Sequence, residues 1–388
     1  MSRQTHKTKP SVLIIGAGIG GLTAAIALAQ RGFEAHVFER APALRAAGAG
    51  LTVQINAMKV FEALGMAQDV HKGGMVATAG ALRDERGRII AATALGDMAQ
   101  RWGAPMVGIH RAVLMRILEE RAHRHGVHIH TSMAFERFTE DNAGVTAHFE
   151  SGRHHRGDAL IGCDGLWSAV RKSLFGDAPT RYAGYTTWRG IAPRSPKPVF
   201  YEDWGPGARF GQVAIAHDQT YWYAVADAPQ GAKDGDDVKG ELMARFGHWA
   251  PDVREVLEAT PEAAIMRTDS IDRSPIQTWG RGRVTLLGDA AHPLTPNMGQ
   301  GACQAIEDAL ALALALEAHA DPSEGLRYYE TTRRQRANWF VNQSWGVGRM
   351  AHSVKATALR RCRDAIMRWT PQSLMDKTMA RIANGGPV

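Results

Sequence analysis

Three glycines near the N-terminus and one acidic residue downstream have the spacing of a turn that binds a dinucleotide. Gly16, Gly18 and Gly21 stand between a short apolar run and a helix-forming segment. In such a turn the first glycine allows a tight bend, the second lets a diphosphate approach the backbone, and the third lets the helix pack closely on the strand. Glu39 lies 23 residues after Gly16, where a carboxylate can accept hydrogen bonds from a ribose. The pattern predicts a dinucleotide site, although it does not distinguish FAD from NAD.

The turn is positioned by a predicted β-α-β unit. Residues 12–15 form a fully apolar run of strand length, residues 22–29 are rich in helix formers, and residues 35–39 have a second strand pattern. The unit spans about thirty residues, which is the length that a right-handed crossover between parallel strands requires. A later apolar run at 284–287 returns the chain to the same kind of strand. The predicted fold class is therefore α/β.

A change in composition divides the chain. Trp and Tyr concentrate between Tyr182 and Tyr223, among alternating patterns that are typical of strands. We predict a discontinuous Rossmann-like dinucleotide-binding domain, formed by residues 1–182 and 276–345. A β-rich substrate domain, residues 183–275, is inserted into it, and a basic C-terminal helical segment, residues 346–388, follows it.

Four segments of the chain resemble, in the same order, those of the FAD-dependent aromatic hydroxylases, which are single-component flavoprotein monooxygenases of the salicylate and hydroxybenzoate hydroxylase type. The resemblance extends from about Val12 to about Tyr329. Its segments are the glycine turn ending in Glu39-Arg40, the run 45–51, the Asp-Gly segment 163–171 and the Gly-Asp segment 288–309. The resemblance implies that the dinucleotide is non-covalently bound FAD.

The resemblance also implies cofactor contacts for individual residues. In the family the second segment lies along the flavin, an arginine reaches the diphosphate or the ring edge, and the aspartate of the Asp-Gly segment touches the cofactor region. In addition to the residues of the glycine turn, the residues of this chain expected to contact the cofactor are Arg40, Arg45, Gly50, Leu51, Arg111 and Asp164.

The fourth segment has a physical interpretation of its own. Asp289 follows an apolar run and could accept a hydrogen bond from a ribityl hydroxyl, which would orient the flavin. Gly299, Gln300 and Gly301 lead into a long apolar helix, whose free N–H groups would face the pyrimidine edge of the flavin and stabilise negative charge. Pro293 restricts the backbone and removes a donor, so we expect its backbone near the reactive C4a carbon of the flavin.

The chemistry that the resemblance implies is monooxygenation. NADH or NADPH reduces the FAD, O2 adds at the flavin C4a, and the resulting hydroperoxide hydroxylates an electron-rich aromatic or conjugated small molecule. One dinucleotide pattern is present, so NAD(P)H is expected to bind transiently. An epoxidase or heteroatom oxygenase with the same cofactor chemistry is an alternative. From another class, so is a non-catalytic carrier or escort protein on the same fold.

The aromatic-rich insertion is the predicted substrate site, because aromatic and apolar walls with few polar groups suit a planar ligand. Arg189 lies in a segment that resembles the first strand of the family's substrate domain, which makes it a candidate pocket residue. The side chains that face the cavity follow from an alternation that the sequence does not phase. We interpret His292 as part of its turn rather than as a general base.

No metal site is predicted. His110, His123, His125, His128 and His130 cluster in the sequence, but no carboxylate or cysteine joins them. The three cysteines are odd in number and lack ligand spacing, which fits a reducing compartment. No apolar run has the length of a membrane span, so the expected location is cytoplasmic.

The positive charge is confined to one part of the chain. Residues 346–388 contribute +6 of the formal net charge of +7. This basic segment lacks the interleaved aromatics of a nucleic-acid surface, so no nucleic-acid partner is expected. We interpret it as a solvated helix face or a subunit contact, in a monomer or a homodimer.

Overall fold

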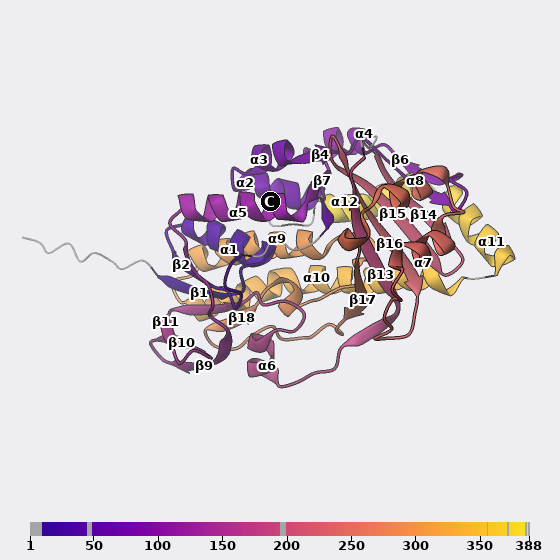
Figure 1. Cartoon of the computed structure of the whole chain (residues 1–388). Coiled ribbons are helices and arrows are strands. Elements are labelled where there is room, and N and C mark those ends of the chain that lie inside the picture. The colour runs from indigo at the N-terminus through magenta and orange to yellow at the C-terminus, as the bar shows by residue number, and fades with distance from the viewer. Residues whose placement is uncertain are drawn as a thin grey trace, which may run out of the picture.

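A parallel sheet of five strands forms the first layer of the fold. The computed structural model describes residues 10–44, 49–194, 199–354, 356–370, 372–384 and 386. The strand order is β18-β12-β1-β2-β8, and every neighbouring pair is parallel (Figure 1). These strands are β1 (Ser11–Ile15), β2 (Glu34–Phe38), β8 (His128–His130), β12 (Ala159–Gly162) and β18 (Val284–Leu286). The distant strand β18 completes the sheet, which confirms the predicted α/β class with a Rossmann-like core.

Helices that are rich in small residues cover one face of this sheet. The helix α1 (Ile19–Ala29) packs against α5 (Arg111–Arg124) and α9 (Gly301–Ala318), and α9 packs against α10 (Pro322–Ser353). Close approach depends on small side chains, since a Cβ on Gly20 would lie 3.0 Å from the Cβ of Ala305. These helices thereby bring the residues that follow β18 against the glycine turn.

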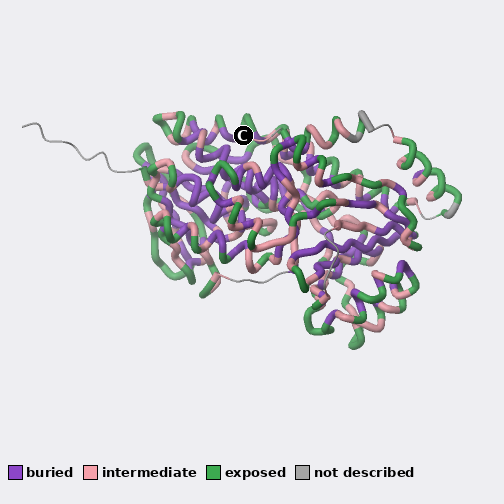
Figure 2. Tube along the Cα trace, turned by 90° about the horizontal axis from the view of Figure 1, so that it is seen from above, coloured by how far each residue is buried: buried purple, intermediate pink, exposed green. Residues whose placement is uncertain are grey.

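A three-stranded antiparallel sheet covers the other face. It has the order β11-β10-β9, with β9 at Phe135–Asp141, β10 at Gly144–Phe149 and β11 at His154–Gly157. Phe149 contacts Phe38 of β2 with ring centroids 4.7 Å apart, and Gly157 lies against Leu13 of β1. Figure 2 shows the buried residues gathered in the interior of the molecule and the exposed residues along its outside.

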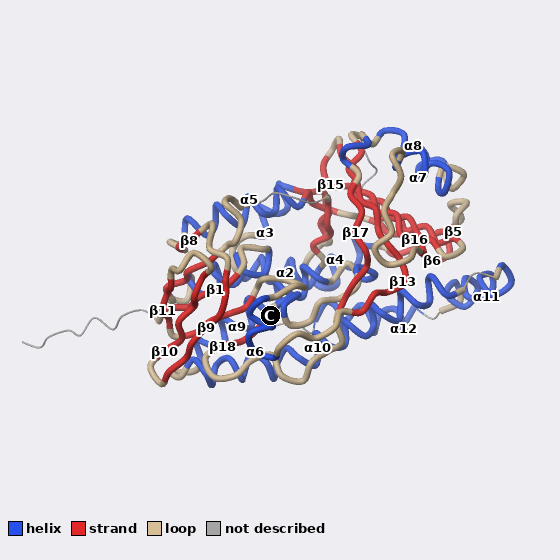
Figure 3. Tube along the Cα trace, turned by 60° about the horizontal axis from the view of Figure 1, so that its bottom comes forward, coloured by secondary structure: helices blue, strands red, loops and turns tan. Residues whose placement is uncertain are grey.

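A seven-stranded sheet forms a second body of structure, which Figure 3 shows at the far end of the molecule from the parallel sheet. Its order is β17-β13-β16-β15-β14-β5-β6. The strands are β5 (Ala79–Asp84), β6 (Ile89–Thr93), β13 (Arg181–Ala192), β14 (Val199–Gly205), β15 (Ala208–Ala216), β16 (Gln219–Asp227) and β17 (Met266–Asp272). Two of these strands, β5 and β6, come from outside the range 183–275 that the sequence assigned to the β-rich insertion.

The strand β5 is fastened to the sheet by a buried ion pair. Arg83 and Asp203 are register partners on β5 and β14, and two hydrogen bonds of 2.6 and 2.8 Å join them. No local pattern predicts this pairing, because the partners lie 120 residues apart in the chain.

The two faces of the seven-stranded sheet have different roles. Trp188, Phe210 and Trp222 lie on one face and pack against α7 (Val238–Phe246) and α8 (Pro251–Ala259) in a separate core. The opposite face points toward the glycine turn. A small sheet of β3 (Gly50–Val53), β7 (Val107–His110) and β4 (Gly74–Val76) stands between them, beside α2 (Ile55–Ala63), α3 (Ala67–Gly73), α4 (Leu95–Trp102) and α6 (Ala169–Phe175).

The C-terminal segment is helical, as expected, but it does not begin at residue 346. The helix α10 runs without a break to Ser353 and is followed by α11 (Thr357–Arg368) and α12 (Gln372–Asn384). The helix α12 packs against α2 and α4, and Ile382 and Ala383 are buried there. Part of this segment is therefore integral to the core. Among the described residues, no helix combines the length and apolar character needed to cross a membrane.

Candidate active site

The glycine turn is closed toward the protein and open at its middle residue. Gly16 has a φ of 106°, and a Cβ there would lie 2.5 Å from the carbonyl oxygen of Cys163. A Cβ on Gly21 would lie 2.0 Å from the carbonyl oxygen of Gly16. At Gly18, by contrast, a Cβ would meet nothing within 4 Å. The backbone is therefore closely packed at Gly16 and Gly21 and has free space at Gly18, and the contact of this turn with a dinucleotide stays a prediction.

The helix that follows the turn presents its positive end to this open space. Gly18 is the N-cap of α1, makes no side-chain cap, and is followed by no acidic residue in the first turn. Gly18, Ile19 and Gly20 line a cavity of about 500 Å³. Free N–H groups and the helix dipole there favour an anionic group such as a diphosphate.

Glu39 stabilises the turn from the end of β2. Its two carboxylate oxygens accept hydrogen bonds from the backbone N–H of Ala17 at 3.0 Å and of Ala41 at 2.9 Å. A carboxylate has further lone pairs, so these bonds leave acceptor capacity for a ribose diol. Arg40 is exposed beside it, and Arg45 lies outside the described residues.

The cavity gathers residues from widely separated parts of the chain. Gly288 and Asp289 come from the turn after β18, and Arg111 begins α5. The other sequence-predicted residues in its wall are Gly18, Gly50, Leu51, Arg189 and Gly301. This cavity therefore offers one region that can bind a phosphate, beside Gly18, and one polar region, beside Arg111 and Asp289.

Asp289 is the acidic group of this cavity. Its carboxylate is open to the cavity and makes no hydrogen bond to any described residue. Desolvation by the surrounding protein raises its pKa above the usual value, against the opposing charges of His292 and Arg111. An acceptor without a protein partner fits a ligand hydroxyl, which is the role that the sequence predicted.

Several predicted cofactor residues do not line this cavity. The carboxylate of Asp164 accepts hydrogen bonds from Ser168 Oγ at 2.5 Å and from the N–H of Ala169 at 2.7 Å, so it caps α6. Pro293 is buried and does not line this cavity either. Direct roles for these two residues remain predictions, while Cys163 and Gly165 do reach the cavity wall.

The side chain of Gln300 points into the protein. It accepts a hydrogen bond from Asn56 at 3.0 Å and donates one to Gln54 at 2.7 Å. Its neighbours Gly299 and Gly301 lie at the cavity walls instead. Any cofactor contact of Gln300 is therefore expected from its backbone, at the N-cap of α9.

Buried charges hold the turn after β18 in place. Asp308 accepts hydrogen bonds from His292 Nε2 at 2.5 Å, Arg333 Nε at 2.7 Å and the N–H of Gly288 at 3.0 Å. Burial alone would raise the pKa of Asp308, but the charges of His292 and Arg333 lower it to about 2. His292 is thus part of the structural support of the turn.

A second cavity of about 560 Å³ adjoins the first. It lies between the free face of the seven-stranded sheet, the strand β3 and the loop 294–299. The two cavities share six lining residues, which are Gly50, Leu51, Arg189, Asp289, Gly301 and Ala302. Arg189 is held in this shared wall by a hydrogen bond to Thr268.

One wall of the second cavity is polar and internally hydrogen-bonded. Glu202 accepts hydrogen bonds from Tyr223 Oη at 2.9 Å, Trp204 Nε1 at 2.9 Å and Arg209 Nη1 at 3.1 Å. Gly211 lies between Glu202 and Tyr223 in the register and leaves room for the tyrosine ring. Burial, and then the charge of Glu202, raise the pKa of Tyr223 well above its usual value, so its phenol stays protonated.

Sequence reasoning missed this polar wall. Glu202, Arg209 and Tyr223 belong to three strands that alternate between the two sheet faces, and the fully apolar alternate positions Phe210 and Trp222 could have phased them. Because side chains alternate along a strand, these polar residues must lie on the sheet face opposite the apolar residues that face the core. Polar residues gathered on one sheet face in this way indicate that this face lines a cavity.

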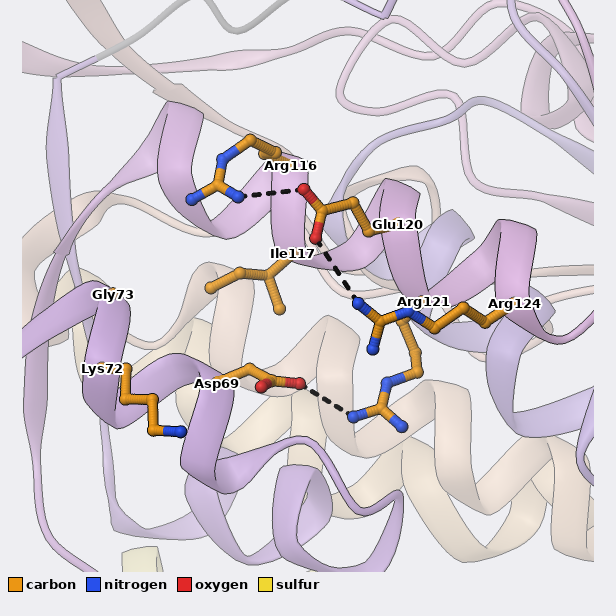
Figure 4. A pocket seen from close by; sticks show the side chains of 8 residues that line it. All are labelled: Asp69, Lys72, Gly73, Arg116, Ile117, Glu120, Arg121 and Arg124. Atoms are coloured by element: carbon orange, nitrogen blue, oxygen red, sulfur yellow. Dashed lines mark hydrogen bonds and ion pairs between the residues drawn. The ribbon is translucent and has the colours of Figure 1, made fainter.

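A further pocket lies on the surface between α3 and α5 (Figure 4). Most of the charged residues that line it are paired with one another, with Arg116 and Arg124 on Glu120 and Arg121 on Asp69. It shares no lining residue with the two adjoining cavities.

The fold, with its glycine turn and adjoining cavities, is that of a flavin-type dinucleotide-binding protein. Residues 9–344 match the family model described as FAD binding domain. The aurachin C monooxygenase/isomerase of Stigmatella aurantiaca is 42% identical over 378 residues, which cover 97% of this chain and 98% of that protein. The 3-amino-4-hydroxybenzoate 2-monooxygenase of Streptomyces cremeus is 39% identical and covers 84% of this chain and 83% of its own.

A solved structure of an FAD-bound protein has the same fold as this chain. HpxO of Klebsiella pneumoniae, complexed with FAD and uric acid, has a TM-score of 0.90 at 31% sequence identity and covers 97% of each chain. The chain belongs to the FAD-binding-domain family and is an FAD-dependent monooxygenase, with NAD(P)H as the reductant that is typical of that family. This class confirms the prediction of an enzyme over that of a non-catalytic carrier.

Proposed function

We propose that this enzyme hydroxylates a planar aromatic or conjugated molecule, bound in the second cavity with one polar edge toward Glu202, Arg209 and Tyr223. The observation that carries the proposal is the wall shared by the two cavities. A ring in the second cavity would then lie beside a flavin in the first, because the same six residues line both cavities. Epoxidation or heteroatom oxygenation by the same site is the alternative, and product structure distinguishes them.

The residues of the first cavity fit FAD. The open side of Gly18 receives the diphosphate, the unpartnered carboxylate of Asp289 accepts from a ribityl hydroxyl, and the first turn of α9 at Gly301 faces the flavin with its positive end. When bound, FAD supplies reduction by NAD(P)H and activation of O2. The chain contributes orientation, the exclusion of water and stabilisation of negative charge.

The polar wall of the second cavity orients the substrate. The three hydrogen bonds to Glu202 fix its carboxylate, and the remaining lone pairs can accept from a substrate O–H or N–H. Arg209 is also held by Asn297 and by His352 Nε2, so its guanidinium is rigid. A ring substituent that donates a hydrogen bond is therefore favoured over one that only accepts.

Apolar side chains form another part of the lining of the second cavity. They are Leu82 of β5, Leu95 of α4, Met379 of α12 and Met106. Leu82 is the register partner of Glu202, so apolar lining lies directly beside the polar wall. The cavity is larger than a single benzene ring requires, and we therefore propose that the substrate has an apolar substituent that packs on these residues.

Two further parts of the proposal concern the state of the protein. The described cysteines are all free, which suits the expected cytoplasmic location. A monomer or a homodimer is expected, and size-exclusion chromatography with light scattering tests that state.

The test is a screen of ring compounds for stimulated NAD(P)H oxidation, with the product identified by mass spectrometry. Compounds with a donor group at one edge and alkyl chains of increasing length at the other should bind more tightly as the chain grows. Glu202→Gln should lower affinity for donor-bearing rings by about tenfold, the value of one charged hydrogen bond. Uniform behaviour of donor-bearing and donor-free rings in both enzymes would contradict this orientation.

A further inference from the structure

We propose that Glu34, His36 and His128 form a binding site for a divalent transition metal ion of the zinc type, separate from the flavin site. One ligand atom from each of these residues lies within 4.8 Å of the others. The sequence pattern did not predict this cluster, because Glu34 and His36 are distant in the chain from the histidines 110–130 and only the fold brings them to His128.

The sheet register creates this cluster. His36 of β2 and His128 of β8 are register partners on neighbouring parallel strands, so their side chains project from the same face. Their rings stack with centroids 4.7 Å apart and planes inclined by 17°. Glu34 begins β2, two residues before His36, and therefore lies on the same face.

The distances are close to those of a coordinated ion. His36 Nε2 lies 3.2 Å and His128 Nε2 lies 3.6 Å from the same oxygen, Glu34 Oε1. Ligand atoms about 2.0–2.1 Å from a tetrahedral ion are about 3.3 Å apart, so small side-chain rotations complete the geometry. Two imidazoles and one carboxylate favour zinc, copper, nickel or cobalt over magnesium or calcium, which prefer oxygen ligands.

The surroundings resemble the supporting shell of a metal site. His36 Nδ1 lies 3.4 Å from His130 Nε2, which leaves Nε2 of His36 free to bind an ion while Nδ1–H donates to His130. His155 of β11 stands against the other side of His36, with ring centroids 4.4 Å apart. His36 is buried, while the Glu34 and His128 side chains are 46% and 52% exposed, so an ion has an entry path and room for a water ligand.

The proposed site is distinct from the cofactor site. Glu34 begins β2 and Glu39 follows its other end, and five strand residues span about 16 Å. An ion would join β2 to the sheet-edge strand β8, which should stabilise the fold without contact with FAD.

The experiment uses the untagged, FAD-bound full chain, stripped of metal by dialysis against a chelator and then titrated with Zn²⁺ by calorimetry. We expect one equivalent to bind with a dissociation constant in the micromolar range or below, and the midpoint of thermal unfolding to rise. His128→Ala and Glu34→Gln should each weaken binding by at least about tenfold. Both residues are exposed, so the variants should retain the flavin spectrum and the fold.

The matched control is His217→Ala, which removes an exposed histidine from the turn between β15 and β16. It should bind Zn²⁺ like the wild type. The proposal is overturned if the wild type takes up no equivalent at micromolar Zn²⁺, or if His128→Ala and Glu34→Gln bind as tightly as the wild type. A loss in His217→Ala equal to that in His128→Ala would also overturn it, because it would show nonspecific surface binding.

Discussion

Substituting alanine at two glycines of the same turn should separate cofactor binding from folding. Gly18 has φ −75° and ψ −177°, which any residue adopts, and its Cβ would enter open space. Gly18→Ala should therefore leave the apoprotein as stable as the wild type, or more stable by about 0.4–1 kcal/mol through a less flexible unfolded chain. Gly21→Ala places a Cβ 2.0 Å from the carbonyl oxygen of Gly16 and should destabilise the fold by about 1–3 kcal/mol.

The cost of Gly18→Ala should appear in FAD affinity. The new methyl group lies where the diphosphate approaches the first N–H groups of α1, and a lost charge-assisted hydrogen bond is worth about 1.5–3 kcal/mol. The dissociation constant for FAD should then rise by about 10- to 150-fold. The assays are quenching of flavin fluorescence on binding and thermal unfolding without added FAD.

Two results would refute this reasoning. One is a Gly18→Ala protein that binds FAD like the wild type, which would move the diphosphate away from the turn. The other is a Gly18→Ala apoprotein as unstable as Gly21→Ala, which would show that the open space is not open in solution.

Four further substitutions test other parts of the account. Asp289→Ala should weaken FAD binding and lower the product formed per NAD(P)H even at saturating FAD, since a displacement of about 1 Å can cost about a hundredfold in rate. Asp289→Asn should have a milder effect. An equal yield of product per NAD(P)H in the wild type and both variants would exclude a role of Asp289 in orienting the flavin. Glu39→Ala should weaken FAD binding, measured by fluorescence quenching, by the value of one charged hydrogen bond, about 1.5–3 kcal/mol, and unchanged affinity would remove Glu39 from the cofactor site. Arg83→Ala should lower the free energy of unfolding in urea by about 3–5 kcal/mol, because it leaves Asp203 buried without its partner, and a loss below about 1 kcal/mol would mean that the pair does not fasten β5. Burial, followed by the charge of Arg209, lowers the pKa of His352 to about 4, so the unfolded chain binds more protons between about pH 6.5 and 4. Stability should fall as the pH drops through that window, by up to about 2 kcal/mol between pH 7 and 5, and His352→Gln should reduce this dependence; an identical pH profile would contradict the assignment.

Local sequence patterns predicted the Rossmann-like part because its geometry is encoded locally. Gly16 and Gly21 each meet a steric requirement of one turn, Gly21 against Gly16 itself and Gly16 against Cys163, which packs directly on the turn. The strand after which Asp289 lies is likewise a short apolar run, and it was found as such although the rest of its sheet is distant in sequence.

The protein partners of predicted site side chains were harder to foresee. The carboxylate of Asp164 accepts hydrogen bonds at the start of α6, which a serine four residues later, Ser168, could have indicated, and its cofactor contact stays a prediction. The amide of Gln300 joins a buried network with the distant Asn56, which no spacing reveals, and its flavin contact likewise stays a prediction. The polar wall around Glu202 depends on the phase of three strands and on the register between them.

In the proposed arrangement, a ring bound in the second cavity receives an oxygen atom from O2 at a flavin held in the adjoining first cavity. The most direct measurement uses a ring substrate from the screen, NAD(P)H and O2 labelled with oxygen-18, followed by mass spectrometry of the product. The account predicts that one labelled oxygen atom enters each product molecule, that none comes from labelled water, and that Asp289→Ala lowers product per NAD(P)H. Product whose new oxygen comes from water, or substrate-stimulated NAD(P)H oxidation that yields only hydrogen peroxide with every screened ring, would contradict it.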